Sequence, residues 1–237
     1  MNCNNTYRDT SSQPFPTTGT LGQHRNFDLL SIKSLYAKDE SLVYYYVIAT
    51  VLNKEGSFVQ TGSAPNFQGG IISLCTCKRF MRTFFKPKHW EGKWVAGFSG
   101  LDAGKRRNAL VFLMRINHAY SSYAELWAAG EITKQTKLAK SASRDSFGDL
   151  YEPIADGGCP YDPKSYKNPL EIHVHHDDSE WHRDIDYENR FGQKPAYLFG
   201  EPEYSYFWNK PMIYLPNSIG IGQRKSQLKD LIKELEG

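Results

Sequence analysis

The chain has 237 residues, of which 40% are hydrophobic and 14% are aromatic, and its formal net charge is +3. The hydrophobic fraction can build a core, which excludes an intrinsically disordered chain. The charge is too small to indicate a nucleic-acid partner by itself. Four cysteines at uneven spacing (Cys3, Cys75, Cys77 and Cys159) exclude a secreted disulfide framework. The N-terminus lacks the pattern of a secretory signal, and no apolar run could cross a bilayer. We therefore expect a cytoplasmic protein without a membrane partner.

Residues 1–25 are polar and contain two prolines, which predicts a flexible N-terminal arm. Apolar runs bounded by glycine turns then predict central strands at 43–52, 71–77, 93–98 and 109–116. Ser122 and Glu125 have the spacing of a capping box, which predicts a helix start. Further strands are expected near 148–154 and at 170–176, 195–200 and 211–216.

The segment 221–237 has the pattern of an amphipathic helix, with four apolar residues on one face (Leu228, Leu231, Ile232 and Leu235). Many strands and few helices indicate an α+β protein. We expect a curved, mostly antiparallel sheet or an open barrel with peripheral helices, formed by a single domain over 26–220.

Two cysteines stand one residue apart in "SLCTC". A strand would place Cys75 and Cys77 on the same face, because side chains repeat every two residues. A structural zinc site needs four ligands, and the remaining candidate, Cys159, lies in the turn "DGGCPYD". Small apolar residues on a packed strand face are therefore the favoured interpretation, and no metal is expected.

The run "HVHHDD" matches the start of the metal-binding signature of metallo-β-lactamase-type hydrolases through His173, His175 and Asp177. The sixth position is Asp178 rather than histidine, and no histidine follows His182. We reject that assignment. A single metal held by two histidines and a carboxylate stays an alternative to a strand that runs into a polar loop.

Other catalytic motifs are absent from the sequence. There is no phosphate-binding loop, no strand-coupled Gly-x-Gly-x-x-Gly and no Gly-x-Ser-x-Gly elbow. Lys105, Arg106 and Arg107 are predicted to form a basic hairpin tip. Such a tip is usually solvated, and if it is functional it contacts phosphates without reading sequence.

Three stretches in order, "SAPNFQGGIISLCTCKRFMR", "GKWVAGFSG" and "LVFLMRINHAYSSYAELW", carry a resemblance to a known family. Together they resemble the second numbered group of the nucleotide modification associated domain proteins. The likeness runs from Tyr44 to Pro216, with departures at Lys93, where aspartate is expected, and Arg79, where proline is expected. The matching positions are Ala64, Pro65, Asn66, Thr76, Cys77, Lys78, Gly92, Trp94, Gly97, Ser99, Met114, Arg115, Trp127, Gly148, Asp149 and Tyr151.

The resemblance implies a bacterial or phage protein linked to systems that modify DNA bases, and it implies this setting more firmly than a reaction. The central strands also resemble PUA-like barrels, in which an extruded base stacks on aromatic rings. The first hypothesis is therefore a binding module for a nucleotide or modified base, with DNA as a further candidate partner. Its ligand-binding residues would be Asn66, Cys77, Lys78, Trp94, Phe98, Ser99 and Arg115, and no cofactor is expected.

The hypothesis makes a geometric prediction. Pairing across the tip 105–107 would place Trp94 near Met114 or Arg115 and Phe98 close to Leu110. Trp94 and Arg115 would then flank a base, with Cys77 packed beside a phosphate-facing Lys78. The ordinary alternative is that Trp94 and Phe98 are core aromatics.

Two other functions stay open. An enzyme that alters a nucleotide or base would use Asp149, Tyr151, His175 and His176 for acid–base chemistry. An interaction subunit of a defence operon would use the C-terminal helix as its contact. Packing of that helix on its own sheet is the favoured alternative.

Overall fold

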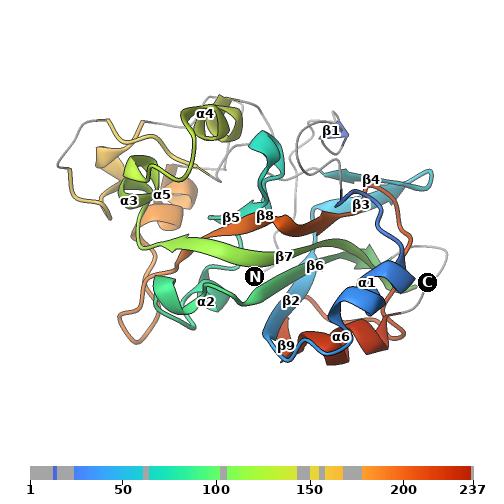
Figure 1. Cartoon of the computed structure of the whole chain (residues 1–237). Helices are drawn as coiled ribbons and strands as arrows, with labels where there is room; N and C mark the ends of the chain where they lie inside the picture. Colours follow the sequence, from blue (N-terminus) through green and yellow to red (C-terminus); the bar gives the residue numbers. More distant parts are fainter. Residues whose placement is uncertain are drawn as a thin grey trace.

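The computed structural model describes residues 13–14, 24–60, 64–101, 106–142, 150–154, 158–167 and 178–235. Its centre is a six-stranded sheet, strongly curled, in the order β5-β8-β7-β6-β2-β9 (Figure 1). All neighbouring strands are antiparallel except β2 and β6. The predicted α+β class, with a curved and mostly antiparallel sheet, is confirmed. The strands are β2 (Leu42–Ile48), β5 (Ser73–Leu74), β6 (Trp94–Leu101), β7 (Asn108–Tyr120), β8 (Tyr197–Phe207) and β9 (Gln223–Gln227).

A small second sheet has the order β1-β4-β3, with β1 at Gln13–Pro14, β3 at Val51–Lys54 and β4 at Ser57–Gln60. Glu55 and Gly56 connect β3 to β4 with φ of 52° and 81°. Two positive φ values match a tight hairpin turn between twisted strands. The prediction of one strand over 43–52 was therefore wrong at its end, because the chain turns at 49–50 and enters the other sheet.

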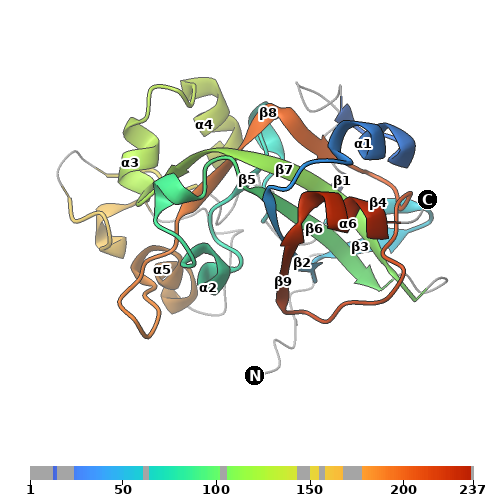
Figure 2. The same ribbon diagram turned by 60° about the horizontal axis from the view of Figure 1, so that its bottom comes forward.

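Six helices are described, α1 (Leu29–Tyr36), α2 (Arg79–Arg82), α3 (Tyr123–Ala128), α4 (Lys134–Ala142), α5 (Asp178–Asp186) and α6 (Leu228–Glu234). Short 3-10 helices lie at Gln68–Gly70, Pro87–His89 and Pro163–Ser165. Figures 1 and 2 show α1 beside α6 at one end of the sheet, with α2 to α5 gathered at the other. No helix in these described ranges is long and apolar enough to cross a membrane.

Helix α3 begins where the sequence predicted. The Ser122 hydroxyl accepts a hydrogen bond from the Glu125 amide at 3.1 Å. The Glu125 carboxylate accepts one from the Ser121 amide at 2.7 Å, one residue earlier than an ideal capping box.

The C-terminal segment differs from its prediction. A helix over 221–237 was expected, but Gln223–Gln227 form β9 along the edge of β2. The four predicted apolar residues, Leu228, Leu231, Ile232 and Leu235, are all buried in the main core. The prediction of a buried apolar helix face was therefore correct, whereas the polar run before the helix pairs as an edge strand.

The other strand predictions succeed where the apolar run is long. The runs at 93–98 and 109–116 became β6 and β7, and 195–200 became the start of β8. The run 71–77 was expected to be central, but it supplies only the two-residue edge strand β5. Asn66 bridges Ser73 there, which turns the chain back on itself. Residues 211–216 make only a bridge at Tyr214. Of the strand predicted near 148–154, the structure describes residues 150–154, which make one bridge at Pro153, and 170–176 lie outside the described residues.

Two buried clusters support these elements. The main cluster fills the space between the sheet, α1 and α6. The second lies under α3 and α5 and is rich in aromatic residues, including Tyr123, Tyr151, Tyr166, Trp181 and Tyr197. This second cluster includes Tyr120 at the end of β7 and Tyr197 at the start of β8. It therefore packs against the end of the sheet near α2.

Candidate functional site

The predicted pairing across the 105–107 tip is confirmed. Trp94 lies opposite Arg115 and Phe98 lies opposite Leu110 in the β6–β7 ladder, with irregular register after Gly97 and Phe98. Gly97 is required there, since a Cβ atom at this position would lie 2.2 Å from Phe112 Cε1. Directly opposite residues share a face of the sheet, so Trp94 and Arg115 are neighbours.

Trp94 nevertheless offers no surface for a ligand. Its exposed fraction is 0%, and Tyr36 of α1 packs edge-on against its ring with the centroids 4.9 Å apart. Phe98 is also fully buried. Both rings behave as core aromatics, which was the ordinary alternative.

Arg115 is already engaged by its own chain. Its Nε and Nη2 atoms donate to Glu201 Oε2 at 2.9 and 2.6 Å, and its guanidinium lies 3.6 Å from the centroid of the Tyr204 ring. Ser99 is used structurally as well, because its hydroxyl donates to Gly100 O and accepts from Ala109 N. The structure brings Trp94, Arg115 and Ser99 onto the same two strands without forming an open pocket around them.

Asn66 belongs to a buried polar network. Its Oδ1 accepts a hydrogen bond from Gln68 N at 2.9 Å. Lys140 of α4 is fully buried and donates to Asn66 O at 3.1 Å and Ile71 O at 2.7 Å. This network holds α4 on the 66–71 turn, which is a structural role.

The two cysteines do not share a face. Strand β5 ends at Leu74, after which Cys75 is buried and Cys77 is exposed. The expectation of a packed Cys77 was wrong for this reason. Lys78 follows with a φ of 54°, donates from Nζ to Ile221 O at 2.8 Å and lies 5.0 Å from the Tyr46 ring centroid. Burial lowers the pKa of Lys78.

Of the four proposed acid–base residues, the structure describes only Tyr151. Tyr151 is buried, and its hydroxyl donates to Asp184 Oδ2 at 3.3 Å. Asp149, His175, His176 and Lys105 lie outside the described residues, while Arg106 is exposed and Arg107 is half-buried. Among the residues that are described, no group of three or more His, Cys, Asp and Glu could hold a metal ion.

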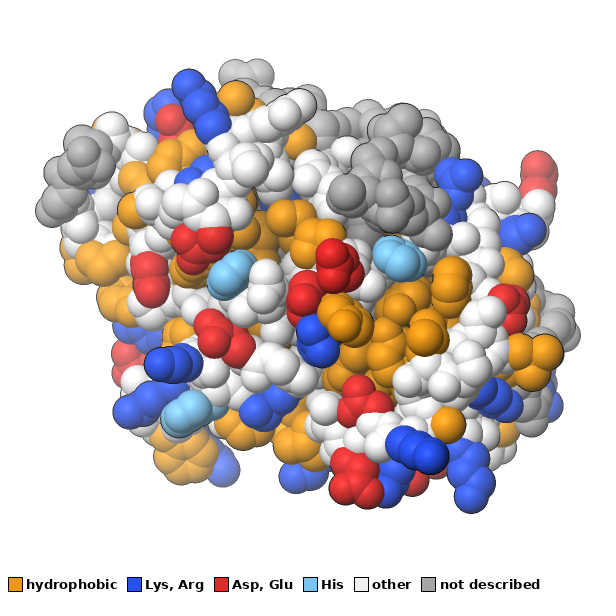
Figure 3. Space-filling view, viewed as in Figure 1, with side chains coloured by type: hydrophobic (Ala, Val, Ile, Leu, Met, Phe, Trp, Pro, Cys, Tyr) orange, Lys and Arg blue, Asp and Glu red, His pale blue; other side chains and the backbone are white. Residues whose placement is uncertain are grey.

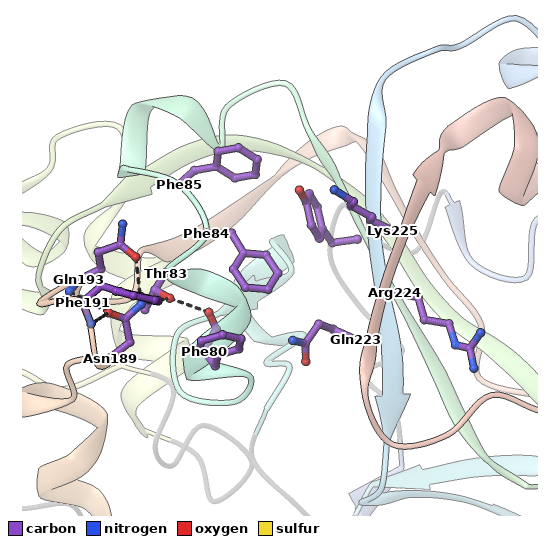
Figure 4. A pocket seen from close by; sticks show the side chains of 11 residues that line it. Phe80, Thr83, Phe84, Phe85, Asn189, Phe191, Gln193, Gln223, Arg224 and Lys225 are labelled. Carbon is purple, nitrogen blue, oxygen red and sulfur yellow. Dashed lines mark hydrogen bonds between the residues drawn. The ribbon is translucent and has the colours of Figure 1, made fainter.

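A cleft of about 640 Å³ lies elsewhere, between the turn after α2, the loop 189–193 and strand β9 (Figure 4). Phe80, Phe84 and Phe191 line it and are 47%, 37% and 67% exposed. We call it the phenylalanine cleft. Exposed rings of this size, gathered around one cavity, are the usual mark of a ligand site rather than of ordinary surface.

Phe80, Phe84 and Phe85 form one aromatic wall. Phe80 and Phe84 meet edge to face with their centroids 5.3 Å apart. Phe84 and Phe85 each lie 5.8 Å from the buried Tyr44 ring of β2, which forms the floor. The wall therefore continues directly into the main core, so its base is rigid.

Polar groups face the same space. The Gln193 Nε2 donor and the whole side-chain amide of Gln223 make no hydrogen bond in the described part of the chain, and both residues line the cleft. Lys225 pairs opposite Tyr44, so it lies on the cleft face of β9, whereas Arg224 points away in Figure 4. The cleft thus combines apolar rings, amides and a cation.

Hydrogen bonds from three side chains connect the segments that form the cleft. Asn189 Nδ2 donates to Thr83 Oγ1 at 2.8 Å, which ties the loop 189–193 to the end of α2. Lys78 ties the start of α2 to Ile221, two residues before β9. Buried Arg82 donates to the carbonyl oxygens of Cys77, Ala196 and Thr76 at 2.9, 2.6 and 3.0 Å. The cleft is therefore largely preformed.

Positive charge is concentrated around this cleft. The three segments that border it, 78–93, 187–194 and 221–227, contain ten of the 29 Lys and Arg residues but only two of the 26 Asp and Glu residues. The small net charge of the whole chain conceals this asymmetry. The sequence carries a signal for this cleft in "RFMRTFFKPKHW", where aromatic and basic residues are interleaved, but this stretch matches none of the motifs considered above.

The fold and cleft define an α+β protein with an aromatic cleft, bordered by basic segments, at one end of a curled sheet. Comparison with family models, with curated proteins and with solved structures found no match. The likeness to the nucleotide modification associated domain proteins therefore rests on the quoted motifs alone.

Proposed function

We propose that the protein binds the base and phosphate of a nucleotide, free or within a nucleic acid, in the phenylalanine cleft. The observation that carries the proposal is the exposure of three phenylalanine rings in a pinned cleft that also holds Lys225. The volume of about 640 Å³ lies within the usual range of small-molecule sites.

Each part of the cleft matches one part of such a ligand. Exposed aromatic faces stack on any base, because every base has a π-face. The amides of Gln193 and Gln223 supply donors and acceptors for a base edge. Lys225 supplies a cation for phosphate, and the surplus of positive charge in the bordering segments draws anions toward it.

The motif resemblance agrees with this proposal, since it points to bacterial or phage systems that modify DNA bases. The resemblance had suggested a ligand site at Trp94 and Arg115, and we place it instead in the phenylalanine cleft. Tyr36 covers Trp94, and Glu201 neutralises Arg115. A cytoplasmic location, where free thiols stay reduced, belongs to the same proposal.

The test is a titration of nucleotides and of modified and unmodified DNA against the wild type, Phe84→Ala and Lys225→Ala. Loss of one stacking ring should cost about 1–3 kcal/mol of binding free energy. Leu30→Ala is the matched control for loss of an exposed apolar side chain, because Leu30 is 78% exposed on α1.

Equal affinities in wild type, Phe84→Ala and Lys225→Ala would refute the proposed site. Turnover of a bound ligand, lost on Asp149→Ala or His176→Ala, would instead establish the enzyme alternative. Absence of binding by every nucleotide and DNA in the panel would leave the interaction subunit as the better hypothesis.

A further inference from the structure

We infer that the natural ligand of the phenylalanine cleft is a single-stranded nucleic acid rather than a free nucleotide or a duplex. This inference rests on the proposed function and specifies the class of ligand. It follows from the spread of the stacking surfaces and of the cations, which is greater than one nucleotide can use.

The stacking surfaces come from two separate segments. Phe80 and Phe84 belong to α2 and the turn after it and contact each other, whereas Phe191 belongs to the loop 189–193 and makes no ring contact with either of them in the described part of the chain. The Arg190 guanidinium lies 4.7 Å from the Phe191 ring centroid, which adds a second flat surface there. One base has two faces, whereas these segments present more than two flat surfaces, so neighbouring bases of a strand can use the rest.

The cations around the cleft divide into two kinds. Arg79 is bound to Asp184 at 2.8 Å, Lys194 to Glu188 at 3.4 Å, and Arg82 is buried on carbonyl oxygens. Five others are exposed and have no carboxylate partner in the described part of the chain, namely Lys86, Lys88, Arg190, Arg224 and Lys225. Because these five side chains are exposed and have no carboxylate partner there, they can bind the successive phosphates of a strand.

Strand β9 extends this cationic surface past the cleft. It is the edge strand of the sheet, and its side chains alternate, so Lys225 faces the cleft while Arg224 points away (Figure 4). One nucleotide carries its phosphates at one place and cannot contact both sides of the strand. A sugar-phosphate backbone that passes the edge can.

A duplex fits the same surface poorly. Stacked and paired bases hide the faces that exposed phenylalanines would contact, whereas a single strand can present its bases outward. The combination of open rings and a cationic border therefore favours a single strand.

The face drawn in Figure 3 differs from the cleft, with apolar side chains gathered between α1 and β8 and acidic groups beside them.

The test is fluorescence anisotropy with a labelled 12-nucleotide single strand, the duplex of the same sequence and the matching mononucleotide, at several salt concentrations. The single strand should bind at least about tenfold more tightly than the mononucleotide. Its affinity should fall with salt with a log–log slope of about −0.7 for each phosphate neutralised.

The double variant Lys86→Ala/Lys88→Ala should reduce that slope by about 1.4 and should weaken single-strand binding more than mononucleotide binding. Lys54→Ala/Lys210→Ala, two exposed lysines outside the bordering segments, is the matched control and should leave the slope as in the wild type.

The outcomes separate this inference from the proposed function. If the mononucleotide binds as tightly as the single strand, or the duplex binds more tightly, the inference is overturned and the proposed function stands. If neither the mononucleotide nor any strand binds, both fail together.

Discussion

Two regions of the molecule bring aromatic rings and cations together, and they differ in what surrounds them. In the closed aromatic group, formed by Tyr36, Trp94, Tyr204, Tyr206 and Arg115, a carboxylate neutralises the arginine and a helix covers the tryptophan. In the phenylalanine cleft the rings are exposed, and the side chains of Gln223 and Lys225 make no hydrogen bond or ion pair in the described part of the chain.

The difference shows that residue type does not distinguish a binding surface from a core. Tyr36 projects from α1 onto Trp94 and shares a hydrogen bond of 2.6 Å with the Tyr206 hydroxyl. These partners satisfy the closed group internally, except for Trp94 Nε1, which has no hydrogen-bond acceptor in the described part of the chain. In the cleft, the corresponding rings and polar side chains stay accessible.

The largest expected effect concerns the closed group and follows from its tyrosines. Burial raises the pKa of Tyr36 and Tyr206, and also that of Tyr123 and Tyr197, above the ordinary value near 10. The folded chain then holds protons that the unfolded chain releases, so stability is intact below pH 10 and is lost as the pH rises above it.

The free energy of unfolding, measured with denaturant from pH 8 to 11.5, should fall steeply above pH 10. Tyrosinate absorbance should rise together with unfolding. The decline should be smaller in Tyr36→Phe, and constant stability up to pH 11 would contradict the burial of these hydroxyls.

Trp94→Ala should give the next largest effect. Removing a fully buried tryptophan usually destabilises a protein by about 3–5 kcal/mol. Phe191→Ala, which removes a ring that is 67% exposed, should change the free energy of unfolding by less than about 0.5 kcal/mol. Thermal and denaturant unfolding of both variants measure this contrast. A stable Trp94→Ala protein with weakened nucleotide binding would restore Trp94 as the stacking surface.

A smaller loss is expected for Arg82→Met, which keeps much of the buried volume but removes the donors to three carbonyl oxygens. Leaving buried acceptors unsatisfied costs about 1–3 kcal/mol. Because Arg82 also joins the α2 turn to Ala196, ligand affinity should fall with stability. Arg183→Met, at an exposed position on α5 outside the segments that border the cleft, serves as the control for loss of a guanidinium. Wild-type stability in Arg82→Met would show that the cleft does not depend on this anchor.

Local sequence patterns predicted the interior strands β2, β6 and β7 and the start of β8. The runs that became β6 and β7 are long and apolar, as expected for strands that are buried on both faces. Their register followed from direct pairing of the two runs across the turn between them. The patterns failed where a tertiary contact decided the outcome. Ser73 pairs with Asn66, which shortens β5, and Gln223–Gln227 pair with β2 instead of joining the helix.

The candidate site was predictable only in part. Alternation of aromatic and basic residues over 79–90 is visible in the sequence, but nothing there shows that Phe191 and Lys225, more than 100 residues later, face the same cavity. Conversely, the motif around Trp94 predicted a base-binding site, because tryptophan and arginine suit base binding. The coverage by Tyr36 and the ion pair with Glu201 depend on elements distant in sequence, so composition could not reveal them.

The place of β9 in the sheet has a consequence for the protein during its synthesis. Strand β2 emerges early from the ribosome, but its outer edge pairs only with Gln223–Gln227, about 180 residues later. Such distant pairing is slow, and an unpaired edge is open to association with other chains. Since β9 also carries Gln223 and Lys225, a nascent chain that stops before it has neither a protected edge nor a complete cleft. Completion of the sheet and completion of the cleft are thus the same late event.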